Sequence, residues 1–201
     1  MAPVEIVPVE NSSEMNAFVD LPWEIYAGNE NWVPPLKSRV RRLLDPSRHP
    51  FWKFSERVLF LARRDSEVVG RIAGILDHNA NRFRNEKAGA WGFFECRDDV
   101  RAAAALFGAV EAWARRKGMT HLRGPLSPST NYETGLLIEG FQYPPVIMMP
   151  YNPPYYLDLV ESCGFQKEKD LVALLIVSSD QVSERLARLA GRLRNKPYIS
   201  I

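Results

Sequence analysis

The chain has 201 residues, of which 46% are hydrophobic and 25% are charged. This length and composition are ordinary for a globular protein of one domain or slightly more, and they exclude a fibrous or wholly disordered chain. The 26 basic and 24 acidic residues give a formal net charge of +2, which by itself does not indicate a nucleic-acid-binding protein.

Other absences narrow the class of protein further. No apolar run approaches the ~20 residues of a membrane-spanning helix, and residues 1–5 lack the basic start of a signal peptide. Two cysteines, Cys96 and Cys163, are too few for a disulfide scaffold, and we expect both to be reduced. These features predict a soluble, cytoplasmic protein without a membrane partner.

The charges are unevenly distributed near the N-terminus. Residues 1–36 contain six acidic residues and no Lys or Arg, whereas residues 37–64 contain nine basic residues and two acidic ones. The basic stretch is either an anion site, for phosphates or a nucleic-acid backbone, or a solvated helix face that pairs with the acidic segment. Both interpretations remain open, and we do not expect a nucleic-acid partner.

The first quarter of the chain predicts a strand followed by helices. Residues 4–9 have the pattern of a short strand, and Asn11 precedes Glu14 by the three residues of a capping box. The helix that begins there is expected to end at Pro22, or a second helix starts there. Apolar residues at helical spacing over residues 36–44 then predict a short basic helix.

An antiparallel meander is the clearest β signal in the sequence. Two apolar runs, residues 57–63 and 68–76, are joined by the short polar connector 64–67, which is typical of a hairpin. The second run is almost continuously apolar, so we expect a central strand that is covered on both faces. A polar turn over residues 77–87 then leads to a third strand at residues 89–94.

A long helix and an irregular segment follow the meander. Asp98 or Asp99 caps the helix at its start and Gly118 ends it, and residues 120–123 form a short strand. Residues 124–150 are rich in proline and apolar residues and have no clean period. Segments of this length inside a compact domain are uncommon and are often functional.

Three more elements are expected before the C-terminus. Residues 151–163 predict a helix that the pair Pro153-Pro154 opens, and residues 171–177 predict a strand. A basic amphipathic helix begins at Asp180 and continues to about Arg194.

The organisation of the chain follows from these elements. We expect one domain at residues 1–178, and a basic helix with the start of a following segment at residues 179–201, which leads into a missing second domain. Ile199 and Ile201 alternate with a polar residue, as in a strand with one apolar face. The apolar segment 124–150 is then expected to pack against that domain or to make the chain self-associate.

Several chemistries are absent from the sequence. It contains no G-x-S-x-G elbow, no G-x-x-x-x-G-K-[ST] loop, no H-E-x-x-H and no C-x-x-C motif. The three histidines are not at metal-ligand spacing, so we expect no metal site.

The order of the elements and their local sequences resemble the GNAT acyltransferase superfamily. Residues 59–72 resemble its β2–β3 hairpin, and Ser162–Phe165 resembles the Gly-Phe end of its fourth helix. Three further stretches resemble a group of bacterial two-domain GNAT-like proteins: Trp91–Glu95, Arg123–Pro125 and Met148–Tyr156. The resemblance covers nearly the whole chain, but only the N-terminal half of such a two-domain protein.

The resemblance implies a fold and two alternative functions. The fold is the α/β (α+β) GNAT-like acyl-CoA N-acyltransferase fold, with a mixed central sheet flanked by helices. The first function is transfer of an acyl group from acyl-CoA, with acetyl-CoA as cofactor, to the amine of a small molecule or peptide. The alternative is a non-catalytic module that binds a small molecule or packs on a partner, which is a second copy or a second GNAT-like domain.

The sequence departs from the superfamily at two functional positions. GNAT enzymes bind the acetyl-CoA pyrophosphate on a glycine-containing loop at the start of the long helix, where Glu95–Val100 here has three carboxylates and no glycine. The general-acid tyrosine of many members corresponds to Val160. The chain is therefore predicted to bind acetyl-CoA weakly or not at all.

Candidate site residues come from the end of the third meander strand and from the irregular segment. A carboxylate at the end of that strand can deprotonate an amine, and nearby tyrosines can replace the missing general acid. The candidate catalytic residues are Glu95, Tyr155 and Tyr156, and the candidate substrate-binding residues are Asn131, Glu133, Tyr151 and Asn152. The simpler alternatives are a helix-flanking acid and a covering loop with surface tyrosines.

Overall fold

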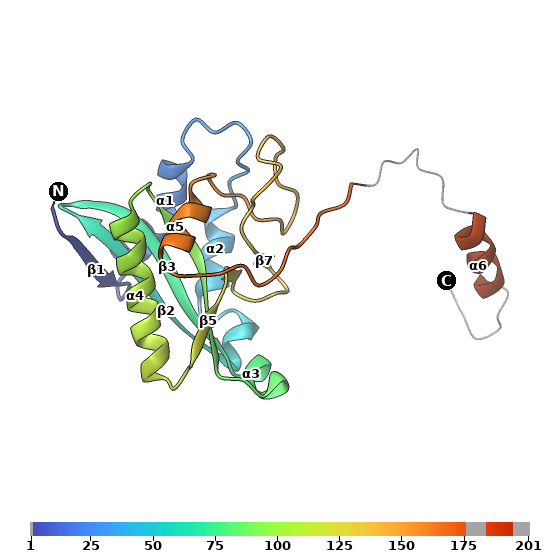
Figure 1. Ribbon diagram of the computed structural model, residues 1–201, viewed down its shortest axis with the longest axis horizontal. Coiled ribbons are helices and arrows are strands. Elements are labelled where there is room, and N and C mark those ends of the chain that lie inside the picture. Colours follow the sequence, from blue (N-terminus) through green and yellow to red (C-terminus); the bar gives the residue numbers. More distant parts are fainter. Residues whose placement is uncertain (1, 176–183, 195–201) are drawn as a thin grey trace. The chain divides into compact units, whose positions relative to one another are not determined.

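The structure is a computed structural model that describes residues 2–175 and 184–194 (Figure 1). The chain divides into two compact units, residues 1–166 and residues 167–201, each of which is described by itself. The division expected from the sequence, at residue 178, lies further along the chain. None of the helices in the described ranges is long and apolar enough to cross a membrane.

A five-stranded mixed sheet forms the centre of the first unit. The strands are neighbours in sequence order; β1 to β4 pair antiparallel, and β4 pairs with β5 in parallel. Their bounds are β1 Val4–Pro8, β2 Ser55–Arg64, β3 Glu67–Asp77, β4 Ala88–Cys96 and β5 His121–Arg123. A short separate hairpin consists of β6 Leu126–Ser127 and β7 Glu133–Thr134. The predicted mixed sheet is confirmed.

Helices cover both faces of this sheet. The helices are α1 Ser12–Ile25, α2 Lys37–Leu44, the 3-10 helix η1 Pro50–Lys53, α3 His78–Arg84, α4 Val100–Arg116, α5 Tyr156–Ser162 and, in the second unit, α6 Glu184–Arg194. One core lies between the sheet and helices α4 and α5, and the other lies between the sheet and α1, α2 and η1. Figure 1 shows α4 lying along the sheet.

Alternation along the strands explains the two cores. Phe60 and Ala62 of β2 belong to the core under α4, whereas Leu59 and Leu61 belong to the core under α1. Strand β3 is buried on both faces, and Ile72 at its centre is 0% exposed. The predicted hairpin and its interior strand are confirmed.

Three expected elements are wrong. Helix α1 continues through Pro22 to Ile25. The supposed polar turn at residues 77–87 contains α3, because the Asp77 side chain accepts a hydrogen bond from the backbone N–H of Ala80 and caps a new helix. Residues 171–175 form no strand, and residues 176 and 177 of that prediction lie outside the described residues.

The remaining boundaries differ in detail. Helix α5 begins at Tyr156, after the proline pair, and not at residue 151. Helix α6 matches the predicted basic helix over 184–194, while residues 180–183, Ile199 and Ile201 lie outside the described residues. Asp99 is the N-cap of α4, and Gly118 follows its end with a left-handed φ of +80°.

Candidate functional site

A partly buried carboxylate lies at the C-terminal end of β4. The Oε2 atom of Glu95 accepts hydrogen bonds from the hydroxyls of Tyr156 at 2.7 Å and Tyr26 at 2.9 Å. Its Oε1 atom lies 3.5 Å from Nη2 of Arg71, and 14% of the Glu95 side chain is exposed. The predicted catalytic residues Glu95 and Tyr156 are thus in direct contact.

Four separate elements bring these side chains together. Tyr26 is the residue that caps the C-terminal end of α1, and Tyr156 is the first residue of α5. Arg71 of β3 lies directly opposite Glu95 of β4 in the strand register. We call Tyr26, Arg71, Glu95 and Tyr156 the carboxylate cluster.

Pro22 explains why Arg71 can enter this cluster. Proline has no backbone N–H, so the α1 hydrogen bond to the carbonyl of Phe18, four residues earlier, cannot form. The Nη1 atom of Arg71 donates to that carbonyl oxygen at 2.5 Å instead, and the guanidinium lies 4.9 Å from the centre of the Phe18 ring. Arg71 therefore joins α1 to the end of β4.

Burial sets the protonation states in the carboxylate cluster. It raises the pKa of the Glu95 carboxyl, although Arg71 and the two tyrosine hydroxyls act in the opposite direction. Burial and the Glu95 charge raise the pKa of both Tyr26 and Tyr156, so that these hydroxyls keep their protons at neutral pH. A carboxyl with a raised pKa, held by two neutral donors, is suited to accepting a proton.

Tyr155 makes a different contact from its neighbour. Its hydroxyl donates to the backbone carbonyl of Cys96 at 2.9 Å, and burial raises its pKa to about 12. The Tyr156 hydroxyl, in contrast, accepts from the backbone N–H of Cys96 at 2.9 Å and donates to Glu95. Of the two predicted catalytic tyrosines, only Tyr156 is bonded to the carboxylate.

Tyr151 and Asn152 fix the irregular segment beside the carboxylate cluster. The carbonyl oxygen of Tyr151 lies 3.2 Å from the Tyr26 hydroxyl. Asn152 is buried, with 4% of the residue exposed. Its side chain accepts a hydrogen bond from the N–H of Leu137 and donates to the carbonyl oxygens of Leu137 and Pro153. Its polar atoms are therefore bonded to the protein backbone.

Asn131 and Glu133 lie at the surface. Both residues are exposed, and neither forms a hydrogen bond to the carboxylate cluster within the described residues. Glu133 is nevertheless close enough for its charge to raise the pKa of Glu95 and to interact with Arg71 and Arg39. The structure thus brings Glu133, but not Asn131, into the electrostatic environment of Glu95.

Sequence reasoning missed Tyr26 and Arg71. The signal for Arg71 was present, because it is the only charged residue in the apolar run Val68–Leu76 and a charge inside a central strand needs a partner. No comparable local signal marks Tyr26, which reaches Glu95 only through the packing of α1 on the sheet.

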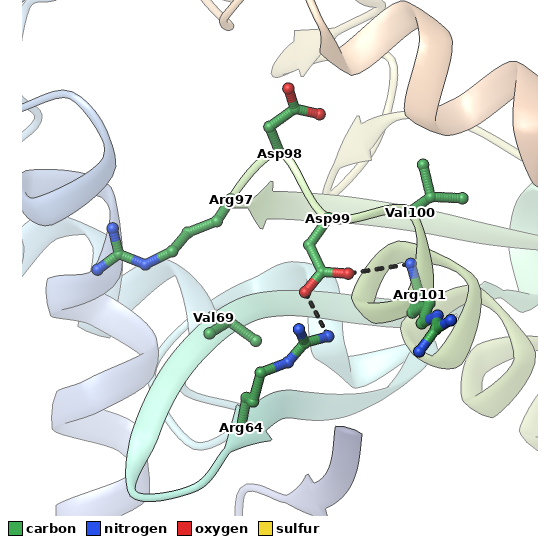
Figure 2. Close-up of a pocket in the computed structure, with 7 residues that line it drawn as sticks. All are labelled: Arg64, Val69, Arg97, Asp98, Asp99, Val100 and Arg101. Atoms are coloured by element: carbon green, nitrogen blue, oxygen red, sulfur yellow. Dashed lines mark hydrogen bonds and ion pairs between the residues drawn. The ribbon is translucent and has the colours of Figure 1, made fainter. Parts of the chain in front are cut away.

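A pocket of about 500 Å³ lies at the start of α4 (Figure 2). It is lined by Arg64, Val69, Arg97, Asp98, Asp99, Val100 and Arg101. The Oδ1 atom of Asp99 accepts from the backbone N–H groups of Arg101 at 3.1 Å and Ala102 at 3.2 Å, and its Oδ2 atom is 2.6 Å from Nη2 of Arg64.

The contacts of Asp99 determine whether a pyrophosphate fits the start of α4. An anion at a helix N-terminus needs free N–H groups and close approach to the backbone. Here Asp99 has taken two of those N–H groups, and no glycine lies between Arg97 and Arg101. The start of α4 therefore does not fit the pyrophosphate of acetyl-CoA in the way that the superfamily binds it.

Strand β4 has a bulge at Phe93 and Phe94, beside the point where β6 packs against it. Strand β4 bulges where Phe93 and Phe94 lie opposite the single residue Ile72, and Phe93 has a left-handed φ of +49°. The N–H of Phe93 donates to Oγ of Ser127 at 3.0 Å. A Cβ atom on Gly92 would lie 1.7 Å from the carbonyl oxygen of Leu126, so β6 lies directly against β4 at that point.

Solved structures share this fold. An aminoglycoside acetyltransferase, AAC(6')-Iy in complex with a CoA bisubstrate analogue, matches with a TM-score of 0.52 and 12% identity over 88% of this chain and 99% of that chain. An aminoglycoside acetyltransferase from an uncultured soil metagenomic sample, in complex with sisomicin, matches with a TM-score of 0.51 and 12% identity over 87% of this chain and 95% of that chain. These are GNAT acetyltransferases, and the chain has the GNAT fold.

Two curated proteins are similar in sequence, although no family model matches the chain. Protein YghO of Escherichia coli is 34% identical over 194 residues, which are 94% of this chain and 48% of that protein. The bacterial ceramide synthase of Caulobacter vibrioides is 34% identical over 192 residues, which are 95% of this chain and 50% of that protein. The chain thus spans about half the length of these relatives.

The described part of the chain offers no metal centre. Among residues 2–175 and 184–194, no three His, Cys, Asp or Glu side chains come together as ligands.

Proposed function

We propose that this chain is the acceptor-binding part of an N-acyltransferase that acylates the amine of a long-chain lipid base. The observation that carries the proposal is the largely buried Glu95 carboxylate, with two tyrosine hydroxyls on one oxygen and Arg71 near the other. The GNAT fold supports acyl transfer as the reaction class. The fold also implies an acyl-CoA such as acetyl-CoA as donor, but the start of α4 does not fit its pyrophosphate.

The chemistry assigned to Glu95 is proton removal. An amine reaches the site as an ammonium ion and reacts with a carbonyl carbon only after it loses a proton. Tyr26 and Tyr156 hold Oε2, so Oε1 is the oxygen that accepts this proton in our proposal. Arg71, whose Nη2 lies 3.5 Å from this same Oε1, remains a fixed positive charge that keeps Glu95 in place.

The acceptor class comes from the curated relative and from the rim of the site. A ceramide is an amide of a long-chain amino alcohol, and one relative is a bacterial ceramide synthase. The loop 138–148 carries exposed apolar side chains and is tied to Tyr151 near the site, because the carbonyl oxygen of Phe141 accepts hydrogen bonds from Asn31 and Tyr151. Such a rim suits the alkyl chain of an acceptor.

Acyl transfer with the Glu95→Gln variant tests the proposal. The assay combines the protein with an acyl-CoA and a C18 long-chain base, and mass spectrometry detects the amide. We expect the substitution to lower kcat/KM by about 10²–10⁴-fold, the range for loss of a general base. Glu139→Gln, an exposed carboxylate in the adjoining loop, is the control and should leave the rate unchanged. Equal rates for the wild type and Glu95→Gln would contradict the role of Glu95.

A binding module without catalysis is the second candidate function. It is favoured by the capped start of α4 and by Val160 at the place of the usual general acid. Isothermal titration with the same long-chain base distinguishes the two. Saturable binding that Glu95→Gln weakens, together with no amide formation, would support the module and exclude catalysis by this chain.

A further inference from the structure

We propose that Asp99 is a built-in anion that occupies the anion-binding position at the start of α4, so that removing its carboxylate converts the pocket into a diphosphate site. This inference does not depend on the proposed function, because it concerns the pocket of Figure 2 and not the carboxylate cluster.

The first step is the set of backbone donors. Helix α4 has 17 residues, and its N-terminus carries a partial positive charge and N–H groups that lack partners within the helix. Asp99 accepts from two of these groups, at 3.1 Å and 3.2 Å. A phosphate oxygen would accept hydrogen bonds from these same N–H groups, so the carboxylate and a phosphate compete for one position.

The second step is the paired cation. The ion pair between Asp99 and Arg64 is 2.6 Å long, and only 15% of the Arg64 side chain and 18% of the Asp99 side chain are exposed. Low exposure strengthens the attraction between the two charges and reduces its screening by salt. Both carboxylate oxygens therefore have partners of the kind that a phosphate uses: backbone N–H groups on one side and a guanidinium on the other.

The third step is the space and charge around Asp99. The pocket has a volume of about 500 Å³, and Arg97 and Arg101 are also among its lining residues. The guanidinium of Arg97 pairs with Glu24 at 3.4 Å. Figure 2 shows Asp98 pointing away from the pair of Asp99 and Arg64. Asp99 is therefore the carboxylate that fills the anion position, whereas Asp98 is a neighbouring charge of the same sign.

A fourth observation extends the same principle to the adjoining strand. Beyond its pairing with β5 at Ala88–Ala90, strand β4 is met by β6, and Ser127 accepts from the N–H of Phe93. Backbone N–H groups at two places, the β4 bulge and the start of α4, thus donate to side chains of this chain and not to a ligand.

Titration calorimetry with inorganic pyrophosphate and with acetyl-CoA tests the proposal on the full chain. The key variant is Asp99→Gly, because glycine is a tolerated N-cap that frees the N–H groups and lets a ligand approach the backbone. Asp98→Gly is the matched control, with the same change in charge one residue away. We expect Asp99→Gly to bind pyrophosphate about tenfold more tightly than the wild type, and Asp98→Gly to bind like the wild type.

Two further variants complete the experiment. Asp99→Asn keeps a neutral N-cap, so it remains folded even if Asp99→Gly does not, and it should strengthen pyrophosphate binding less than glycine does. Arg64→Gln in the Asp99→Gly background should remove the gain. Equal pyrophosphate affinities for the wild type, Asp99→Gly and Asp99→Asn would overturn the proposal. So would micromolar binding of acetyl-CoA to the wild type that Asp99→Gly does not strengthen.

Discussion

Glu95 is held by residues that are also needed for folding. Tyr26 and Tyr156 donate to one oxygen, and Arg71 faces the other while it also satisfies the Phe18 carbonyl that Pro22 leaves open. A substitution at any of these positions therefore changes both the chemistry of the site and the stability of the protein. Experiments on the carboxylate cluster need a stability measurement beside every activity measurement.

Arg71→Met should destabilise the protein strongly. The substitution leaves a buried carboxylate and a helix carbonyl without their cationic partner, which typically costs about 3–5 kcal/mol in the free energy of unfolding. Urea denaturation followed by circular dichroism measures this cost. Arg116→Met, on the exposed end of α4, is the control and should change the free energy of unfolding by less than about 0.5 kcal/mol. The double variant Arg71→Met/Glu95→Gln should recover part of the loss, whereas additive costs would contradict a direct pairing.

The stability of the protein should depend on pH through Glu95. Because burial raises the pKa of this carboxyl in the folded state, the folded protein binds the proton more tightly than the unfolded chain. The stabilising contribution of that proton is fully present below the unfolded pKa and is lost as pH rises through the folded pKa. Tyr26, Tyr156, Arg71 and Glu133 are the groups whose charges or hydrogen bonds act on Glu95.

The comparison with Glu95→Gln isolates this contribution. We expect the free energy of unfolding of the wild type, minus that of Glu95→Gln, to decrease as the pH is raised above 4.5, the ordinary pKa of a glutamic acid. Denaturant titrations at a series of pH values measure the difference, and Glu139→Gln is the matched exchange of a carboxylate for an amide at the surface. A difference that increases over this range would show that the pKa of Glu95 is lowered by Arg71 and not raised by burial.

At the scale of elements, the close approach of β6 to β4 depends on Gly92. A Cβ atom there would meet the Leu126 carbonyl oxygen at 1.7 Å, which is backbone and cannot rotate away. Gly92→Ala should therefore displace β6 and lower the free energy of unfolding by about 1–3 kcal/mol, the usual cost of overpacking. Gly108→Ala is the control, because a Cβ on this exposed helical glycine has nothing within 4 Å, and it should stabilise α4 by about 0.5–1 kcal/mol. Equal melting temperatures for the two variants would contradict the contact.

Local patterns were sufficient for the elements that carry their own signals. The hairpin of β2 and β3, the Asn11–Glu14 capping box and the Asp99 cap of α4 follow from residues that are close in sequence, and all three are present. The prediction that the first helix ends at Pro22 was wrong, because a side chain distant in sequence, Arg71, donates to the Phe18 carbonyl in place of the lost backbone hydrogen bond. Helix α3 was not predicted, because its residues are mostly polar and form no apolar stripe at helical spacing.

The candidate site was predictable to the same limited extent. Glu95 follows from the resemblance to GNAT proteins, and Tyr156 lies where a tyrosine was expected to replace the missing acid. The choice between Tyr155 and Tyr156 depends on which side of the α5 start faces β4, and no local pattern contains that information. Asn152 has the residue type of a ligand-binding group, yet its position beside Leu137 gives it a structural contact.

At the scale of the whole molecule, the irregular segment leaves apolar side chains at the surface. Leu136 and Leu137 are half-buried in the first unit, but Val146, Ile147 and Met148 are exposed, with Ile147 at 86%. Exposed apolar patches of this kind usually mark an interface or a ligand groove. The chain spans about half the length of the curated relatives that it matches.

We expect this surface to make the 201-residue chain self-associate. Sedimentation velocity over a range of concentrations should show a rising average mass, because association removes apolar area from water. Ile147→Lys should shift the distribution towards the monomer, whereas Phe83→Lys, an equally exposed aromatic on α3, should not. A wild-type chain that stays monomeric at every concentration would exclude the interface and leave the ligand groove as the explanation.

The contacts of Tyr26 also determine when the site can form during synthesis of the chain. Its hydroxyl bonds a residue 69 positions later and lies against one 125 positions later, and Tyr156 reaches back 61 positions to Glu95. Contacts of such long sequence separation form slowly, because a long loop must close before they contribute any free energy. Helix α1 is therefore made several seconds before its partner in α5, at a translation rate of about 5–20 residues per second. Tyr26, Arg71 and Glu95 are therefore all made before α5, and Tyr156, the first residue of α5, completes the carboxylate cluster.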